Sequence, residues 1–304
     1  MNLLVTGGCG FIGSHLVDKL VLAGHKIFVI DNLSTGVEEN CNKGAKYFFF
    51  SLEEILVSKS KVRDIFIENE IEGVFHLAAL ADVRKSIDEP LLAFNINSMV
   101  TFVLANLCIE HNVNKFIFSS TSAVYGEPKY LPVDESHPVN PMSPYGLSKL
   151  YSEDYLEYLS NYKGLNSIVF RFPNVYGPRQ RSDLEGGVVA IFKERMQKQQ
   201  NINFFGNGSQ TRDWVHCFDI VRAMFSVCNL ELKGYNLISL GSGFKNTLRE
   251  LFDLMSTEFN YIKEPVISDP REGDILHMVM SADKASKEIN WNAQISLKEG
   301  ISRL

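Results

Sequence analysis

The feature that most constrains this chain is a glycine-rich loop between an apolar run and a helical pattern. Residues 7–13 read Gly-Gly-Cys-Gly-Phe-Ile-Gly and directly follow the apolar residues 3–6. Residues 12–22 then carry apolar side chains at spacings of three and four, as helices that cover a sheet do. Glycines there let the backbone turn tightly and approach a phosphate at a helix N-terminus. The segment predicts the opening strand, turn and helix of a dinucleotide-binding fold.

Short apolar runs alternate with helical segments through the first half of the chain. The expected strands are residues 3–6, 27–30, 73–77, 115–119 and 167–172, and the expected helices are residues 12–22, 90–109 and 144–162. Strands that alternate with helices form βαβ units around a parallel sheet. We expect an α/β fold: a doubly wound, parallel-sheet Rossmann domain over residues 1–173 and a smaller α/β substrate-binding lobe over residues 174–304, with segments that return to the first domain.

Asp31 closes the second expected strand, 18 residues after Gly13. A carboxylate at this place accepts the hydroxyls of an adenosine ribose and repels a 2′-phosphate. The residues that follow, 32–35, include no arginine that could reverse this preference. The expected cofactor is therefore NAD rather than NADP. No Gly-Lys-Ser/Thr sequence follows the glycines, which excludes a P-loop.

The pattern Tyr-x-x-x-Lys occurs twice, at residues 125–129 and 145–149. Residues four apart on a helix share one face, so the ammonium can lie near the phenol. A glycine and a proline inside the first copy make a helix implausible there. Ser143-Pro144 gives the second copy an N-cap and a proline at the first helical position. We expect Tyr145 to be a general base whose pKa is lowered by Lys149.

Residues 119–122 read Ser-Ser-Thr-Ser and follow the expected strand 115–119. Ligands of open α/β sheets bind at the carboxyl ends of the strands. One of these hydroxyls is therefore placed to hydrogen-bond a reacting hydroxyl of a substrate.

Composition argues against several classes of protein. The formal net charge of -6, without runs of Lys or Arg, argues against a nucleic-acid partner. The first residues lack the pattern of an export signal, and apolar stretches such as residues 74–81 and 100–109 are about half the roughly 20 residues of a membrane-spanning helix, so no membrane partner is expected. Five cysteines without a CxxC pair, and seven histidines without HExxH, suit a reducing cytoplasm and predict no metal site.

In combination, these motifs resemble the extended short-chain dehydrogenase/reductases. The resemblance is to their NAD-dependent nucleotide-sugar epimerase/dehydratase family and, within it, to the UDP-glucose 4-epimerases. It is carried by the glycine loop, Asp31-Asn32, residues 76–79 (His-Leu-Ala-Ala), 119–121 with 124–126 (Val-Tyr-Gly), 145–149, 174–179 (Asn-Val-Tyr-Gly-Pro-Arg), 212–216 (Arg-Asp-Trp-Val-His), 271–274 (Arg-Glu-Gly-Asp) and Asn290-Trp291. It spans essentially the whole chain.

The resemblance implies the roles of individual residues. It makes Tyr145 the base, Lys149 its activator and Thr121 the hydroxyl partner. For the cofactor it implies Gly7, Gly10, Phe11, Ile12, Gly13, Asp31, Asn32, Ser34, Thr35, Gly36, Leu52, Leu77, Ala78, Ala79, Asn97, Ser119, Tyr145, Lys149 and Pro173. For the UDP-sugar it implies Thr121, Tyr145, Asn174, Gly187, Val188, Asn203, Phe205, Arg212, Arg271, Asp274 and Met278. Two arginines from separate segments suit a diphosphate, because guanidinium groups fork onto phosphate oxygens.

The reaction implied by the resemblance is 4-epimerisation of a UDP-hexose through a 4-keto intermediate. Related dehydratases carry an Asp-Glu pair after the threonine, whereas this chain has Ser122 and Ala123. Without those acids the elimination of water has no evident proton donor, which favours epimerisation. The alternatives are a uronate epimerase, a decarboxylase or a dehydratase, and a non-catalytic NAD-binding protein. The helices over residues 90–109 and 143–162 are candidates for a homodimer contact.

Met278 lies in the segment that resembles the substrate-lining strand of the family. Relatives carry there either a bulky tyrosine, which excludes N-acetyl groups, or a small residue, which admits them. Methionine is unbranched and repacks around an added group. We expect turnover of UDP-glucose and UDP-galactose, with weaker turnover of their N-acetylated forms.

Overall fold

The computed structural model describes residues 1–113, 115–184, 187–231, 233–270 and 275–304. A seven-stranded sheet forms its centre, and every neighbouring pair of strands is parallel. In spatial order the strands are β3 (Ala45–Phe49), β2 (Lys26–Asp31), β1 (Asn2–Thr6), β4 (Gly73–His76), β5 (Phe116–Thr121), β6 (Ser167–Phe172) and β11 (Tyr235–Ser239). The predicted doubly wound α/β fold is confirmed.

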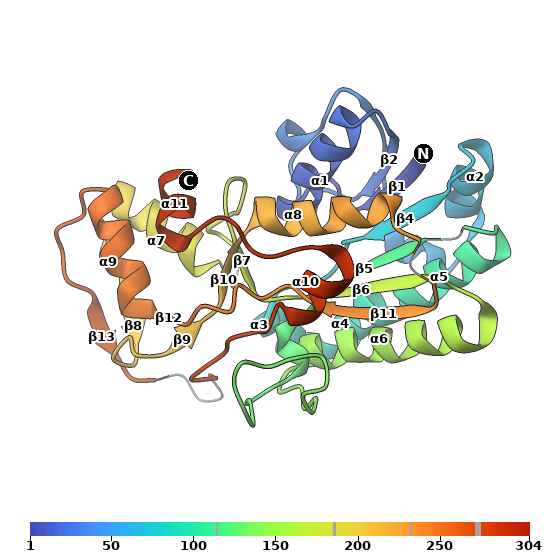
Figure 1. The fold of residues 1–304 in the computed structure, drawn as a ribbon. Helices are drawn as coiled ribbons and strands as arrows, with labels where there is room; N and C mark the ends of the chain where they lie inside the picture. The colour runs from blue at the N-terminus through green and yellow to red at the C-terminus, as the bar shows by residue number, and fades with distance from the viewer. Residues whose placement is uncertain (114, 185–186, 232, 271–274) are drawn as a thin grey trace.

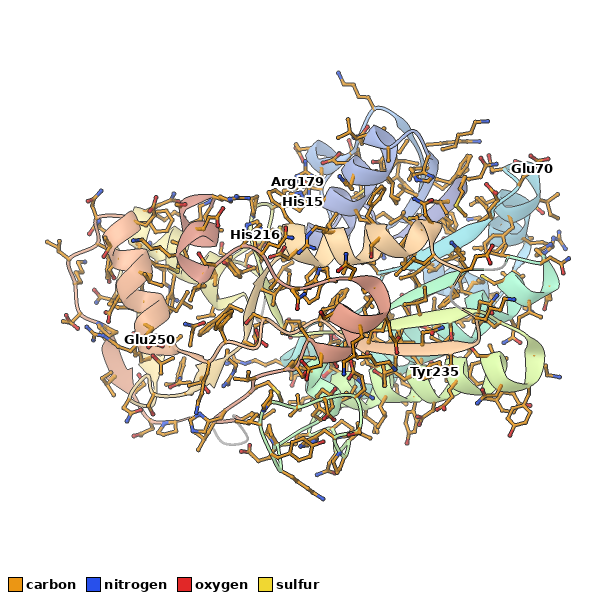
Figure 2. The ribbon with its side chains drawn as sticks, in the orientation of Figure 1. His15, Glu70, Arg179, His216, Tyr235 and Glu250 are labelled. Carbon is orange, nitrogen blue, oxygen red and sulfur yellow. The ribbon has the colours of Figure 1, made fainter. Side chains whose placement is uncertain are left out.

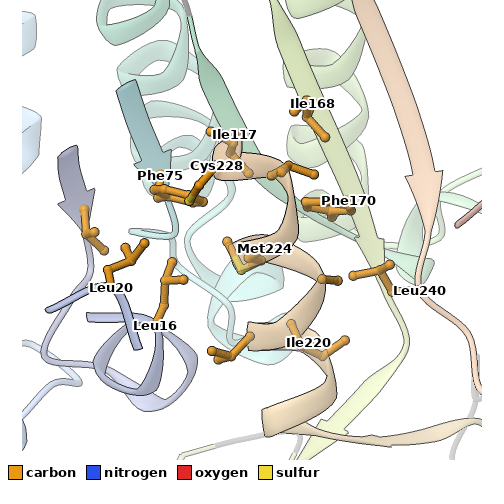
Figure 3. Packing of buried hydrophobic residues seen from close by; sticks show 14 of the residues in the cluster. Leu16, Leu20, Phe75, Ile117, Ile168, Phe170, Ile220, Met224, Cys228 and Leu240 are labelled. Atoms are coloured by element: carbon orange, nitrogen blue, oxygen red, sulfur yellow. The ribbon is translucent and has the colours of Figure 1, made fainter. Parts of the chain in front are cut away.

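Helices cover both faces of this sheet. One face carries α1 (Phe11–Leu22), α8 (Cys217–Ser226) and α10 (Asp283–Ile289), and the other carries α2 (Ser60–Glu68), α5 (Val100–Glu110) and α6 (Pro144–Lys163). Figure 3 shows Leu16 of α1 and Met224 of α8 facing Phe75 and Phe170 of the sheet. Residues adjacent to these in the strands point to the opposite core, as Val74 does. Burial on both faces explains why the strands read as continuous apolar runs.

The second half of the chain contributes both to the sheet and to a separate group of small elements. Strand β11 pairs with β6 at the edge of the sheet. The other elements are the strand pairs β7 (Asn174–Tyr176) with β10 (Trp214–His216), β8 (Asn203–Phe205) with β13 (Val266–Ser268) and β9 (Thr211–Arg212) with β12 (Asn246–Thr247), and the helices α7 (Val188–Gln197), α9 (Leu248–Glu258) and α11 (Leu297–Ser302). Figure 1 shows α7, α9 and α11 together at the end of the molecule away from the N-terminus.

Short helical turns connect these elements. They are η1 (Glu38–Asn40), η2 (Leu52–Leu56), α3 (Val83–Asp88), α4 (Pro90–Phe94), the π-helical turn η3 (Asn95–Met99), η4 (Ser122–Val124) and η5 (Val227–Asn229).

Together α4, η3 and α5 form one helix, Pro90–Glu110, of 21 residues, whose most apolar 18-residue window has a mean hydropathy of 1.7. By length and composition alone it could cross a membrane, which corrects the expectation that the apolar stretches reach only half that length. Such a helix is weak evidence of a span, since core helices pass the same test, and half of its most apolar window is buried inside the molecule. Its buried residues include Asn97 and Ser98, which both donate hydrogen bonds to Ser148 of α6, at 2.9 and 2.8 Å. These bonds tie the helix to a neighbouring helix over the sheet.

Candidate active site

A cavity of about 1300 Å³ lies at the carboxyl ends of the strands. Residues at or directly after the ends of six strands, β1 to β6, line it, as expected for a ligand site in a parallel sheet. Of the residues predicted for the cofactor, it is lined by Gly7, Gly10, Phe11, Ile12, Gly13, Asp31, Asn32, Ser34, Thr35, Leu52, Leu77, Ala78, Ala79, Ser119, Tyr145, Lys149 and Pro173. Of those predicted for the substrate, it is also lined by Thr121, Asn174, Gly187, Arg212 and Met278.

The glycine loop has the shape that a pyrophosphate needs. Gly7 has a φ of +72°, and a Cβ there would lie 2.9 Å from the amide nitrogen of Ala78. A Cβ at Gly13 would lie 2.1 Å from the carbonyl oxygen of Gly7. Helix α1 begins after Gly10, and no side chain caps it. Its first amides are therefore left for an anionic ligand, so these residues fit the diphosphate of NAD.

Asp31 is held in place by two backbone amides. Its Oδ2 accepts from Cys9 N at 2.9 Å and its Oδ1 accepts from Leu33 N at 2.8 Å. The carboxylate is 8% exposed and lines the cavity. This position agrees with the predicted role in selecting a ribose without a 2′-phosphate.

Residues 32–35 carry no arginine, but an arginine from a distant part of the chain reaches the loop that they form. Arg181 comes from the distant loop after β7 and donates from Nη1 to Thr35 O at 3.1 Å. It also forms an ion pair with Asp183 at 2.5 Å. Sequence reasoning missed Arg181 because only residues next to Asp31 in the chain were considered.

The start of this loop is fixed to α1. His15 Nε2 donates to Pro178 O at 2.9 Å, and Arg179 forms an ion pair with Asp18 at 2.8 Å. Figure 2 shows His15 and Arg179 side by side at α1. Because the cavity wall includes both Arg179 and Arg181, these contacts bring two cations to the cofactor end of the cavity.

Helix α6 positions the predicted base. Its N-cap Ser143 accepts from Gly146 N at 3.1 Å, and Pro144 is the first helical residue, as predicted. Tyr145 therefore sits in the first turn, where it faces the cavity and hydrogen-bonds Thr121. Burial raises the pKa of Tyr145, and the Thr121 hydroxyl lowers it.

Lys149 lies one turn further along α6 and is 2% exposed. Its Nζ donates to Ser119 O at 2.9 Å and lies 4.7 Å from the centre of the Phe118 ring. Burial lowers the pKa of Lys149 to about 7, and the Glu153 carboxylate opposes that change. The expected lowering of the Tyr145 pKa by Lys149 is not found. Burial raises the pKa of the phenol, and burial also lowers the pKa of the lysine, so that only part of the Lys149 population is charged near pH 7.

The first Tyr-x-x-x-Lys copy, residues 125–129, is not helical, as predicted. Tyr125 is fully buried, and its hydroxyl lies 3.1 Å from that of Ser239. Gly126 has a φ of +64°, and a Cβ there would clash with Asn140 O. Tyr125 is a core residue.

Two residues predicted for the cofactor lie behind the cavity wall. Asn97 bonds to the backbone of Leu80, accepting at 2.8 Å and donating at 3.1 Å, and its amide also donates to Ser148. Gly36 packs against Cys9, to which a Cβ would come within 2.8 Å. Both residues contact the backbone that shapes the cavity, and neither lines the cavity itself.

Three residues predicted for the substrate also lie away from this cavity. Val188 packs into the core of the second-half helices, and Asn203 is an exposed residue of β8. Phe205 lines a second hollow of about 780 Å³. Arg271 and Asp274 lie outside the described residues.

Comparison with known proteins identifies the chain's family. A model of the NAD-dependent epimerase/dehydratase family matches residues 3–238. The chain belongs to this family. The expected resemblance is therefore confirmed, as are an isomerase activity and NAD as the cofactor.

Three solved structures show how similar the whole chain is to members of the family. A UDP-glucose 4-epimerase of Thermotoga maritima with UDP-glucose is 41% identical, covering 99% of this chain and 96% of that one, with a TM-score of 0.95. A UDP-glucose 4-epimerase of Thermus thermophilus with NAD is 35% identical over 100% and 97% of the chains, with a TM-score of 0.91. A UDP-N-acetylglucosamine 4-epimerase of Methanobrevibacter ruminantium with UDP-N-acetylmuramic acid is 32% identical over 99% and 96%, with a TM-score of 0.91.

The chain is thus an NAD-dependent nucleotide-sugar epimerase. These relatives differ in the sugar named for them. Sugar preference is therefore a question for this chain's own cavity residues.

Proposed function

We propose that this epimerase interconverts UDP-glucose and UDP-galactose, with N-acetylated UDP-hexoses as weaker substrates. The observation that carries the proposal is the meeting of Thr121, Tyr145 and Lys149 in the cavity that the glycine loop forms. The cavity wall after Thr121 is made by Ser122 and Ala123, which are not acids. The wall therefore supports proton removal from a hydroxyl and offers no acid there for the loss of water.

Bound NAD supplies a reversible acceptor for the hydride of sugar carbon 4. Tyr145 accepts the proton of the 4-hydroxyl, and Thr121 orients that hydroxyl by a hydrogen bond. In the molecules in which Lys149 keeps its proton, its ammonium favours the tyrosinate form of the base. Once the 4-keto sugar has rotated to present its other face, the hydride would return to carbon 4 on that face while Tyr145 returns the proton to the oxygen, which inverts the configuration at carbon 4.

The UDP part is proposed to extend from Asn174 and Arg212 toward the second hollow. Ile275 lines both spaces, which supports their continuity, and Phe205 offers an aromatic face in the hollow. Arg212 carries the positive charge that a diphosphate requires.

We also propose a cytoplasmic homodimer. The exposed side of α6 carries Tyr151, Tyr158 and Tyr162, which are 46%, 48% and 73% exposed, and Leu91 of the neighbouring helix is 79% exposed. An apolar and aromatic strip of this kind is typical of a protein interface. Sedimentation equilibrium tests the dimer, and Tyr158→Glu should shift it to monomer. The five cysteines are free, as a reducing compartment would keep them.

The deciding experiment follows the products formed from UDP-glucose, UDP-galactose, UDP-GlcNAc, UDP-GalNAc and UDP-glucuronate in parallel. Equilibration of UDP-glucose with UDP-galactose is expected. Turnover of UDP-glucuronate alone would favour a uronate epimerase or decarboxylase, and a 4-keto-6-deoxy product would reveal a dehydratase.

A further inference from the structure

A fully buried ion pair lies beneath the proposed active site. Glu153 of α6 and Arg171 of β6 are 2% and 4% exposed, and Arg171 Nη2 lies 2.6 Å from Glu153 Oε2. Arg171 Nε donates to both carboxylate oxygens, at 3.1 and 3.2 Å. Removing two charges from water is costly, and well-packed apolar residues are often as good for stability. Stability alone therefore does not account for the pair.

The pair is connected to the strand end that carries the reacting hydroxyl. Ser119, Ser120 and Thr121 are consecutive in β5. Ser119 accepts from Lys149 through its carbonyl oxygen, Ser120 donates to Glu153 through its hydroxyl, and Thr121 contacts Tyr145. Arg171 is also the β6 residue directly opposite Ser120 in the sheet. One short stretch of β5 is thus attached to α6 at successive residues.

The pair also acts on the charge of Lys149. The titratable groups near this lysine are His76 of β4 and, one helical turn before and after it on α6, Tyr145 and Glu153; Arg171 of β6 acts on it through Glu153. His76 is neutral, because burial and then Lys149 lower its pKa to about 3. Glu153 lies one helical turn beyond Lys149 and is the carboxylate that favours its charged form.

We propose that Glu153 is a positioning residue of the reaction: anchored by Arg171, it fixes the end of β5 through Ser120 and keeps the Lys149 ammonium charged beside Tyr145. The role rests on the proposed functions of Tyr145 and Lys149. Turnover needs a charged Lys149 and an ionised Tyr145 at the same time. Since Lys149 loses its proton more easily than Tyr145 does, the Glu153 charge increases the share of molecules in which the proton is on the lysine.

The test is the pH dependence of kcat for UDP-galactose in Glu153→Gln, which removes the carboxylate charge and keeps a side chain of nearly the same shape. Loss of an opposite charge should lower the pKa of Lys149 by about one unit. We therefore expect the acid limb of kcat to move about one unit to lower pH, and the plateau of kcat to fall about tenfold. KM should stay within about twofold of wild type.

Two further variants keep the test open if Glu153→Gln, which leaves Arg171 without its counter-charge, does not fold. Glu153→Gln/Arg171→Met removes the buried cation together with the carboxylate, and it should move the acid limb in the same direction but by less, because the two lost charges act on Lys149 with opposite signs. Ser120→Ala keeps both charges and removes the bond to β5. It should lower kcat several-fold with the acid limb in place, and an unchanged kcat would refute the positioning of β5.

Asp219→Asn is the matched control. Asp219 of α8 is also 2% exposed and paired with an arginine, Arg222, at 2.7 Å, but it lies outside the cavity wall. It should lose stability and keep the acid limb of wild type. If the Glu153 variants behave like this control, Glu153 is structural only. Tyr145→Phe in the same series distinguishes failure of this proposal from failure of the proposed function. If that variant turns over like wild type, the assignment of Tyr145 as the base is wrong.

Discussion

Arg181 Nη1 donates a hydrogen bond to the carbonyl oxygen of Thr35 at 3.1 Å, although 146 residues separate the two in the sequence. Thr35 belongs to the loop that follows Asp31, so a cation from the second half of the chain reaches the adenosine end of the cofactor site. Asp31 and Arg181 act in opposite directions on a 2′-phosphate. Because Asp183 pairs with Arg181 and weakens its attraction, we expect the repulsion by Asp31 to dominate and to favour NAD.

The first prediction is that Asp31→Ala narrows the preference for NAD over NADP by at least about tenfold, or about 1.4 kcal/mol. Removal of the carboxylate ends its repulsion of the 2′-phosphate and leaves Arg181 to attract it. Calorimetric titration of cofactor-free protein measures both affinities. In Asp31→Ala/Arg181→Ala the gain for NADP should disappear, and a gain that persisted would show that Arg181 plays no part.

The second prediction separates the two tyrosines of the repeated motif. Tyr145→Phe should lower kcat by about 100-fold or more, because it removes the proton acceptor. Tyr125→Phe should keep turnover and lose about 1 kcal/mol of stability, because it removes a buried hydrogen bond to Ser239. Initial rates and chemical unfolding of both variants provide the comparison. Equal rates for Tyr145→Phe and wild type would contradict the assignment.

The third prediction is that Lys149→Met raises the melting temperature at pH 7 while it abolishes turnover. The pKa of Lys149 is about 7 in the folded protein and ordinarily 10.5, so between these values the unfolded chain binds more protons. The lysine therefore opposes folding fully below pH 7, and its cost fades by about 1.4 kcal/mol per pH unit as the pH rises toward 10.5. The gain in melting temperature should shrink between pH 7 and pH 10. A gain independent of pH would contradict a buried, easily discharged lysine.

Local signals explain which parts of the site the sequence could predict. Ser143 and Pro144 mark the start of α6 whatever packs around them, so the position of Tyr145 on a helix followed from its neighbours in the chain. The signal for the glycine loop is equally local, because its turn and the helix after it are set by adjacent residues.

Contacts between distant segments explain what the sequence could not predict. Glu153 reads as one more polar residue of a helix, and only the approach of β6 shows that it is buried against Arg171. The resemblance implies that Asn97 binds the cofactor, yet its side-chain amide donates to Leu80 and Ser148. These outcomes depend on tertiary packing, about which spacing along the chain carries no information.

The last prediction concerns the sugar. Met278 lines the cavity and is 3% exposed, and it packs with Val124, Tyr125 and Met280 in a small apolar cluster. A flexible apolar wall of this kind rejects added volume by only about 1 to 3 kcal/mol. Met278→Tyr should therefore suppress turnover of UDP-GlcNAc more than that of UDP-glucose. Met278→Ser should raise turnover of UDP-GlcNAc relative to that of UDP-glucose.

Met280→Ser is the matched control for the Met278 variants, because Met280 is fully buried in the same cluster and does not line the cavity. It should cost stability, as large-to-small changes in a core do, and leave the ratio of kcat/KM for the two sugars unchanged. The measurement is that ratio in all three variants. If both Met278 substitutions change the two sugars by the same factor, Met278 only fills the core, and sugar preference must be set elsewhere in the cavity wall.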